Sequence, residues 1–146
     1  MSPDAAFTWA GNLVIPAWLL LVVLPRWSWT TRLITTVLVP GLLTLAYIYF
    51  LVDAWGATDG GFGSLAAVAE LFSDPRALLA GWIHYLAFDL LVGSWMVRDA
   101  QRRGVKHAFV IPCLVFCFLA GPVGYLLYLA IRLAVTREIL MERVTR

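Results

Sequence analysis

Charged residues are scarce in this 146-residue chain, at 14% of the total, while 62% of the residues are hydrophobic. Soluble domains carry about 25% charged residues, so this composition excludes an ordinary soluble protein. The basic residues fall in short clusters between apolar runs, without the interleaved aromatics that follow a nucleic-acid backbone. We therefore predict one integral membrane domain over residues 1–146, with no nucleic-acid partner.

Cysteine is equally sparse. Cys113 and Cys117 stand four residues apart in an apolar run, so they share a helix face and do not form a disulfide framework. A metal site that combines them with His84 and Asp89 is conceivable, but small residues packed between helices explain the cysteines more simply. We predict no metal and no cofactor. The sequence also lacks a nucleophile–base motif, a phosphate-binding glycine loop and a dinucleotide fingerprint.

Positive charge is missing from the amino terminus, where no Lys or Arg precedes Arg26. A secretory signal carries positive charge ahead of its apolar core, so we expect the first apolar run to be retained as a helix. An Arg- and Ser-rich transit peptide is missing as well. The expected location is a bacterial inner membrane, or a plastid-type membrane if such a peptide has been removed.

Four apolar runs are present, each near the roughly 20 residues that a helix needs to cross a bilayer. They cover residues 7–24, 33–52, 77–97 and 108–131. We predict an all-α fold, an integral membrane four-helix bundle. The fourth run contains the sequence Gly-Pro-Val-Gly at 121–124, where the chain either crosses with a kink or turns back. We favour the crossing, because two half-segments would leave many backbone groups unpaired in lipid.

The connections between these runs differ in charge. The first and third hold the basic residues Arg26, Arg32, Arg98, Arg102, Arg103 and Lys106, which predicts that both are cytoplasmic. The middle connection is acidic and should face the other side. Within it, residues 64–72 are predicted to form a short amphipathic helix on the membrane surface, with Ser64 as its cap. The carboxyl-terminal tail, which contains Arg132 and Arg137, contradicts this orientation if the fourth run crosses.

Asp89 is the strongest candidate for chemistry, because a charged side chain at the centre of a spanning helix costs about 2.5–3.5 kcal/mol on insertion scales. In its protonated form it could donate a proton. Alternatively, it only forms a hydrogen bond that fixes helix packing.

His84 lies five residues before Asp89, about 140° around the helix, so the two side chains could flank one cavity without forming a tight pair. Alternatively, His84 is an interfacial residue bonded to water or a carbonyl.

Polar and aromatic side chains are expected to gather near His84. If the four runs alternate in direction, several of them reach the outer half of the bundle. The predicted substrate-binding residues are Asn12, Tyr47, Trp82, Tyr85, Tyr125 and Tyr128. The alternative is that the tyrosines belong to an ordinary interfacial belt at the helix ends.

Several short motifs occur in a characteristic order. They are Phe72-Ser73, Trp82-Ile83-His84, Asp89-Leu90, Pro112-Cys113-Leu114 and Gly121-Pro122-Val123-Gly124. With these motifs the chain resembles the abscisic-acid-deficient-4-like family, most clearly over residues 70–131. Plant members are small four-helix membrane proteins needed for neoxanthin synthesis. The resemblance implies a role in carotenoid or isoprenoid metabolism within the membrane.

The plant reaction, violaxanthin to neoxanthin, is an isomerisation in which an epoxide opens, a proton leaves the adjacent carbon and an allene forms. As a hypothesis, Asp89 protonates the epoxide oxygen and His84 accepts the carbon-bound proton, or the roles are exchanged. The compact, Arg-rich third connection is typical of bacterial membrane proteins, so the expected substrate is a related carotenoid or another polyene.

Two other functions stay open. One is a non-catalytic pigment-binding or scaffolding subunit of a larger membrane complex. The other is a small transporter or proton pathway built on Asp89, which would need oligomerisation to enclose a cavity. Whether the chain is an enzyme is therefore undecided at this level. The expected partners are membrane lipid, a lipid-soluble polyene, and a second copy or another subunit.

Overall fold

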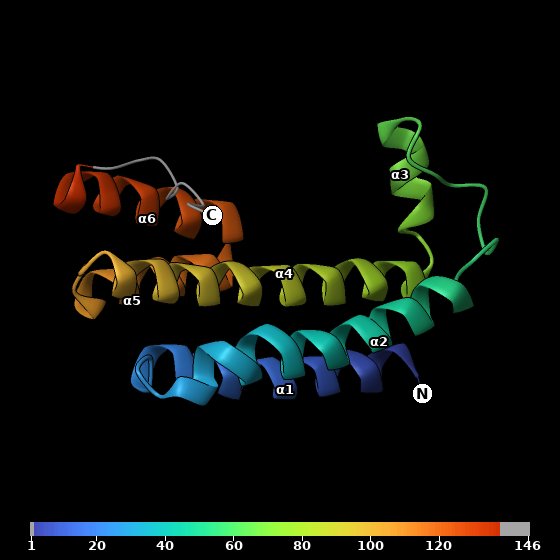
Figure 1. Cartoon of the computed structure of the whole chain (residues 1–146). Coiled ribbons are helices and arrows are strands. Elements are labelled where there is room, and N and C mark those ends of the chain that lie inside the picture. The colour runs from blue at the N-terminus through green and yellow to red at the C-terminus, as the bar shows by residue number, and fades with distance from the viewer. Residues whose placement is uncertain (1, 138–146) are drawn as a thin grey trace, which may run out of the picture.

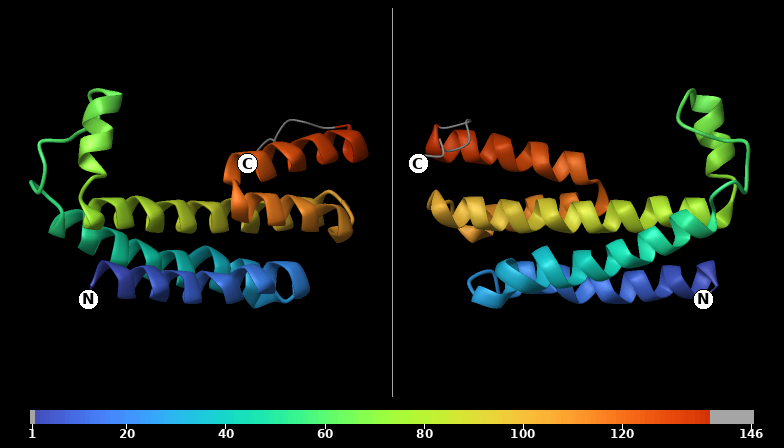
Figure 2. Two further views of the ribbon diagram at one scale, coloured as in Figure 1. Left: turned by 180° about the vertical axis from the view of Figure 1, so that it is seen from behind. Right: turned by 45° about the vertical axis from the view of Figure 1, so that its right-hand side comes forward.

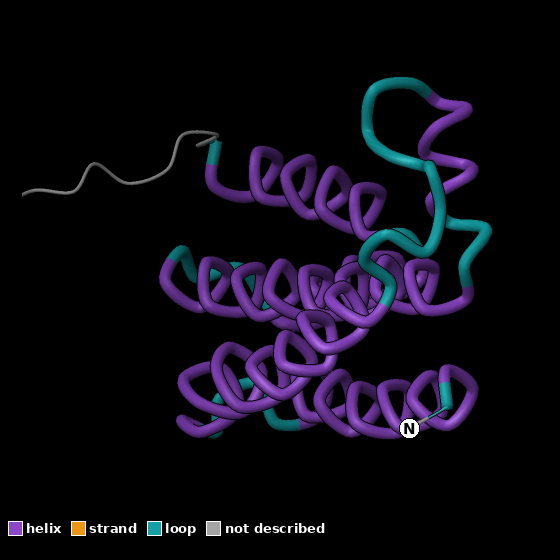
Figure 3. Tube along the Cα trace, turned by 90° about the vertical axis from the view of Figure 1, so that its right-hand side faces the viewer, coloured by secondary structure: helices purple, strands orange, loops and turns teal. Residues whose placement is uncertain are grey.

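The computed structural model describes residues 2–137, in which the regular elements are all helices and no strand occurs (Figures 1 and 3). The predicted all-α class is confirmed. The elements are α1 (Pro3–Val23), the π-helix η1 (Thr30–Leu38), α2 (Val39–Asp53), α3 (Leu65–Leu71), α4 (Pro75–Arg102), α5 (His107–Leu119) and α6 (Gly121–Thr136).

Three helical segments are long and apolar enough to cross a membrane: α1, the continuous rod formed by η1 and α2, and α4. They correspond to the first three predicted runs. They contain 21, 24 and 28 residues, respectively. α4 is the central element, because it packs against α1, the η1–α2 rod, α5 and α6 (Figure 2).

The π-helix η1 was not anticipated from the sequence, which reads as a regular helix over 33–52. Its wider turn places Thr35 opposite the backbone of Thr30, and Thr35 Oγ1 donates a hydrogen bond to the Thr30 carbonyl over 2.8 Å. Ser94 of α4 meets the same hydroxyl, with 2.6 Å between the two side-chain oxygens. Buried threonine and serine hydroxyls therefore join the first half of this rod to α4.

The acidic middle connection contains a short helix at nearly the residues predicted for one, 64–72. Residues 56–63 form an irregular loop, and α3 follows with Ser64 as its N-cap, whose hydroxyl accepts a hydrogen bond from the Ala67 amide. α3 contains no buried residue, and Leu65 is 87% exposed. In Figure 1, α3 lies across the direction of the long helices, as a helix on a membrane surface would.

The fourth apolar run does not form one helix. α5 ends before Ala120, whose φ of −157° and ψ of 83° are not helical, and α6 then runs back beside α5 (Figures 1 and 2). The preference for a full crossing over 108–131 is therefore wrong, and the four-helix bundle is replaced by three long helices with a helical hairpin. The alternative, that the run turns back at its Gly-Pro sequence, agrees with the structure: the non-helical residue is Ala120, and residues 121–124 form the first turn of α6.

Proline and glycine explain the turn. Pro122 has no amide hydrogen to donate to the Phe118 carbonyl, and its ring would clash with that carbonyl in a continuous helix. The Tyr85 hydroxyl donates to this carbonyl instead, over 3.1 Å. Gly124 allows the two helices to cross closely, because a Cβ atom there would meet the backbone of Cys113 and Cys117. Within the turn, the Ala120 amide donates to the Phe116 carbonyl, and the Val123 and Gly124 amides donate to the Ala120 carbonyl, so these backbone groups are paired.

Gly124→Ala is expected to destabilise the protein by about 1–3 kcal/mol, since the obstacle is backbone that cannot rotate away. The matched control is Gly41→Ala in α2, where an added Cβ would meet nothing within 4 Å. This control should be neutral, or stabilising by up to about 1 kcal/mol, because alanine favours helix more than glycine does. Unfolding midpoints in detergent measure both changes; equal midpoints would contradict the close crossing.

Because α6 turns back, acidic and basic residues are concentrated at opposite ends of the bundle. The acidic residues Asp4, Asp53, Asp59, Glu70 and Asp74 belong to the end of the bundle that carries α3. The opposite end, which holds connections 24–29 and 103–106 and is called the Arg-rich end, also receives the last turn of α6. Arg132 and Arg137 therefore join the other basic residues there.

Asp74 fixes the start of α4. It accepts hydrogen bonds from the Arg76 amide at 2.8 Å and from the Arg76 guanidinium at 2.8 and 3.0 Å. Arg76 also donates to the Asp53 carbonyl at the end of α2, over 2.9 Å. The guanidinium holds the pKa of Asp74 at about 2, below the usual 3.8.

Because the pKa of Asp74 is lower in the folded protein, its contribution to stability is complete above about pH 4 and is lost as the pH falls toward 2. Arg76→Gln should return the pKa of Asp74 toward 3.8 and thereby remove this pH-dependent contribution to stability. A carboxyl-carbon NMR titration of the two proteins measures the change. Identical titration curves would show that Arg76 is not the cause.

Candidate active site

Asp89 lies midway along α4, beside the turn between α5 and α6. A Cβ atom on Gly121 would meet its carboxylate, so only glycine permits this approach. Within residues 2–137, Asp89 Oδ2 is the buried side-chain oxygen without a hydrogen-bond partner. Leaving a buried polar atom unsatisfied costs about 1–3 kcal/mol, and such atoms call for an explanation, which a functional role supplies.

The first turn of α6 faces this carboxyl group. The amino end of a helix carries a partial positive charge, so it stabilises negative charge placed beside it. α6 begins midway along the length of α4, because its helix starts at the hairpin turn, at Gly121 (Figure 1). Discontinuous helices in membrane transporters present their ends to ligands in the same way. This arrangement explains how an apolar helix tolerates a carboxyl group at its centre.

A row of aromatic rings leads along one face of α4 toward Asp89. Phe7 of α1 and Trp82 have ring centroids 5.6 Å apart, and Trp82 and Tyr85 are 5.3 Å apart. Tyr85 lies one helical turn before Asp89. We call Phe7, Trp82 and Tyr85 the aromatic row. The structure thus brings two predicted substrate-binding residues, Trp82 and Tyr85, to the face of α4 that carries Asp89.

His84 faces a different neighbour. Its ring lies 5.7 Å from the ring of Tyr47 in α2 and stacks on Phe88 at 4.5 Å. His84 and Tyr47 line a cavity of about 650 Å³ at the α3 end, together with Trp55, Phe62 and Phe72. Asp89 does not line this cavity. The predicted proximity of Tyr47 and His84 is confirmed, but Asp89 and His84 are not brought to one cavity.

Tyr125 and Tyr128 do not reach the level of His84, because α6 turns back. Tyr125 contacts the ring of Trp95 at 5.6 Å, and Tyr128 is fully buried toward the Arg-rich end. The prediction that these two tyrosines gather near His84 is therefore wrong. Asn12 is exposed on α1.

The sequence reading missed a buried charged cluster around Asp99, near the end of α4. Tyr128 donates a hydrogen bond to Asp99 Oδ2 over 2.6 Å, and Arg132 forms an ion pair with the same oxygen at 3.2 Å. Arg103 binds Oδ1 at 3.0 Å. Arg132 is only 1% exposed. The sequence did contain a sign of this cluster, because Arg132 interrupts an otherwise apolar stretch. We had assigned Arg132 to the tail, since we expected the fourth run to cross the membrane and end before it.

The cysteines lie close to the hairpin without forming a metal centre. Cys117 Sγ donates to the Asp89 carbonyl at 3.6 Å, and Cys113 Sγ donates to the Phe109 carbonyl at 3.3 Å. Across residues 2–137, no three His, Cys, Asp or Glu side chains are grouped to hold a metal ion. The Cys117 thiol therefore packs against α4, while the backbone of both cysteines lies at the crossing of α5 and α6.

Together, the three membrane-length helices and a carboxyl group set against the turn of a helical hairpin define a small all-α protein whose architecture fits a membrane. The ABA4-like family model, described as ABA DEFICIENT 4-like, matches residues 5–128, and the chain belongs to this family. The resemblance found in the motifs is thereby confirmed.

One curated relative is the chloroplastic Protein ABA DEFICIENT 4 of Arabidopsis thaliana, which is 25% identical over 131 residues. The match covers 83% of this chain and 57% of the relative, so the chain spans little more than half the length of that protein. No solved structure shows significant similarity to the chain.

Proposed function

We propose that this chain is a multi-pass membrane protein of carotenoid metabolism, which binds a polyene along the aromatic row and isomerises it by acid–base chemistry at Asp89. The observation that carries this proposal is the unpartnered Asp89 Oδ2, buried beside the amino end of α6. Membership of the ABA4-like family supports the substrate class through the link of its plant members to neoxanthin synthesis.

Charge distribution supports the orientation. With three crossings and a hairpin that returns, all basic connections and the end of α6 fall on one side of the membrane. An excess of Lys and Arg marks the cytoplasmic side. The Arg-rich end is then cytoplasmic, and the conflict that a fourth crossing created for Arg132 and Arg137 disappears.

The aromatic row suits a flat, conjugated, lipid-soluble substrate. Phe7 is 51% exposed and Trp82 is 41% exposed on the outside of the bundle, where a bilayer would surround them. A polyene dissolved in the bilayer can stack on these rings without entering water. Since Asp89 Oδ2 is buried, contact with the substrate requires side chains beside it to move on binding.

One carboxyl group is sufficient for the proposed isomerisation. Protonated Asp89 transfers its proton to an oxygen of the polyene as the C–O bond breaks. The carboxylate then takes a proton from the adjacent carbon, and the C–H electron pair forms the new double bond. The acid is regenerated and no redox partner is consumed. We assign both transfers to Asp89 because His84 contacts Tyr47 and Phe88 on another face.

Trp82→Ala should weaken polyene binding about tenfold, which corresponds to roughly 1.4 kcal/mol, because it removes the central ring of the row. The assay follows the absorption shift of candidate carotenoids on titration into the full chain in lipid nanodiscs. Trp29→Ala is the matched control, since Trp29 is 53% exposed at the Arg-rich end. Equal losses for the two variants would remove the aromatic row from the binding site.

A further inference from the structure

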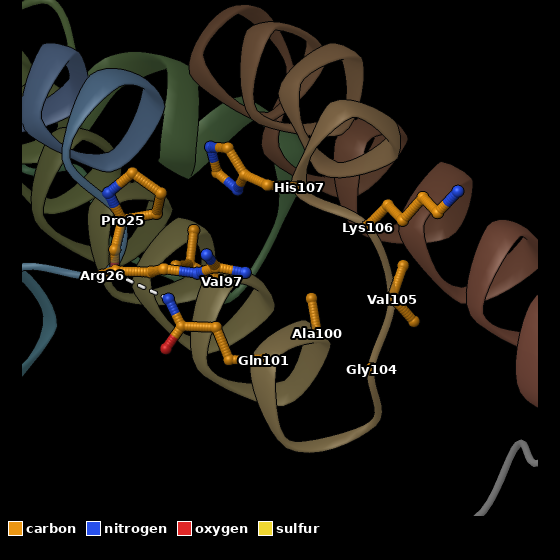
Figure 4. Close-up of a pocket in the computed structure, with 9 residues that line it drawn as sticks. All are labelled: Pro25, Arg26, Val97, Ala100, Gln101, Gly104, Val105, Lys106 and His107. Atoms are coloured by element: carbon orange, nitrogen blue, oxygen red, sulfur yellow. Dashed lines mark hydrogen bonds between the residues drawn. The ribbon is translucent and has the colours of Figure 1, made fainter.

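A second cavity, of about 350 Å³, lies at the Arg-rich end between the α1–η1 connection and the α4–α5 connection (Figure 4). We call it the basic cavity, because Arg26, Lys106 and His107 line it together with the amide of Gln101 and no carboxylate does. The basic cavity and the cavity of His84 lie at opposite ends of the long helices. The basic cavity has no part in the function proposed above.

Hydrogen bonds between distant segments hold the walls of the basic cavity. Gln101 Nε2 donates to the Pro25 carbonyl over 2.6 Å, which ties the end of α4 to the chain that follows α1 (Figure 4). His107 Nε2 donates to the Val22 carbonyl over 3.0 Å, which ties the start of α5 to the end of α1. The cavity is therefore preformed by the fold.

The positive charge in the basic cavity is not neutralised by a carboxylate of the described residues, 2–137. Among residues 2–137, no carboxylate forms an ion pair with Arg26 or Lys106, whereas Arg103 and Arg132 both pair with Asp99. In Figure 4 the Arg26 side chain extends across the cavity, and the Lys106 ammonium points outward from its rim. The start of α5 beside it has no side-chain cap, which adds the partial positive charge of a helix end.

An apolar hollow of about 410 Å³ adjoins the basic cavity and shares Arg26 and His107 with it. Its other walls include Val23, Leu24 and Trp27. These side chains are exposed, and they lie where α1 ends, at the level at which tryptophan meets lipid headgroups. A ligand that fits both spaces has an anionic head and an apolar tail.

We infer that the basic cavity binds the phosphate headgroup of an anionic phospholipid, whose acyl chain lies over Val23, Leu24 and Trp27. Basic pockets between membrane helices on the cytoplasmic side bind such headgroups, and each nearby Lys or Arg strengthens the attraction. This inference needs the chain to lie in a membrane with the Arg-rich end at the surface. It does not depend on carotenoid binding or on Asp89.

Native mass spectrometry of the full chain, released from nanodiscs that contain equal phosphatidylglycerol and phosphatidylcholine, tests the inference. The wild-type chain should retain phosphatidylglycerol preferentially. Arg26→Gln should weaken this retention about fivefold, and Arg26→Gln with Lys106→Gln roughly 25-fold, given the attraction contributed by each charge. Arg32→Gln is the matched control, because Arg32 is an exposed arginine of the same end that does not line the cavity.

The control should change retention less than twofold, because Arg32 does not line the cavity. An equal loss in Arg32→Gln, or equal retention of the two lipids by the wild type, would overturn the inference. Inorganic phosphate is the second probe, in a thermal-unfolding assay in detergent. If phosphate stabilises the wild type as much as phosphatidylglycerol does, the ligand is a soluble phosphate and the lipid assignment fails. Unfolding midpoints of all variants verify that they are folded.

Discussion

Asp89→Asn should abolish polyene isomerisation while leaving polyene binding intact. Asparagine has nearly the same shape but neither donates nor accepts the transferred proton, and the loss of a general acid–base group lowers rates by about 10²–10⁴-fold. The measurement is chromatography of carotenoids extracted after incubation with the full chain in nanodiscs. The absorption titration with the same variant establishes that the polyene still binds.

His84→Gln is the matched variant for this experiment, because it removes the other ionisable group of the third apolar run. It should retain activity within tenfold of the wild type, since His84 lines a separate cavity. A loss as large as that of Asp89→Asn would return His84 to the mechanism and overturn the single-carboxyl scheme. Identical product profiles for wild type and Asp89→Asn would remove Asp89 from it.

A third result distinguishes the enzyme from the pigment-binding alternative. If the wild type binds a polyene along the aromatic row and returns it unaltered with every candidate carotenoid, the isomerase proposal fails and a pigment-binding subunit is favoured. If the wild type binds none of them, the substrate class itself is wrong. The lipid inference at the Arg-rich end is unaffected by either result, because its readout contains no carotenoid.

Asp99→Ala should destabilise the protein by about 3–5 kcal/mol, the cost of removing one partner from a buried charged group. The carboxylate is shared by Tyr128, Arg103 and Arg132, and it joins α4 to α6. Losing it leaves the guanidinium of Arg132 buried without this counter-charge. Unfolding in detergent, followed by circular dichroism, measures the change. Asp59→Ala, on the exposed middle loop, should stay within about 0.5 kcal/mol.

A double variant separates the charge effect from simple loss of packing. Adding Arg132→Met to Asp99→Ala removes the second buried charge. The loss of stability in the double variant should therefore be smaller than the sum of the losses in the two single variants. Strict additivity would show that the two residues do not interact through their charges. A small effect of Asp99→Ala alone would contradict the role of this cluster in closing the hairpin.

The three long helices were predictable because each depends on a local property of its own segment. A run of about 20 apolar residues forms a helix in lipid whatever its neighbours are, since every backbone group must be paired within the segment. The cap at Ser64 was predictable for the same reason, as it bonds an amide three residues away. The net charge of each connection was also predictable, because it depends only on the residues within that connection.

The hairpin was not predictable from the run 108–131 alone. Its hydropathy is that of a crossing helix, and Gly-Pro sequences occur in kinked crossings as well as in turns. The turn is stabilised by residues distant in sequence: Tyr85 satisfies the carbonyl freed by Pro122, and Asp99 pairs with Arg132. The Arg-bearing tail was the one sequence feature that disagreed with a crossing, and it indicated the correct answer.

For the candidate site, the sequence determined that a carboxyl group lies inside an apolar helix, because composition and position along one segment suffice for that. Tertiary structure decided what surrounds it. The amino end of α6 beside Asp89, the aromatic row and the separation of His84 from Asp89 all follow from how helices pack, and contacts between helices depend on side chains far apart in the chain. Asp89 was thus identifiable from its own segment, whereas its neighbours emerged only once the fourth run turned back.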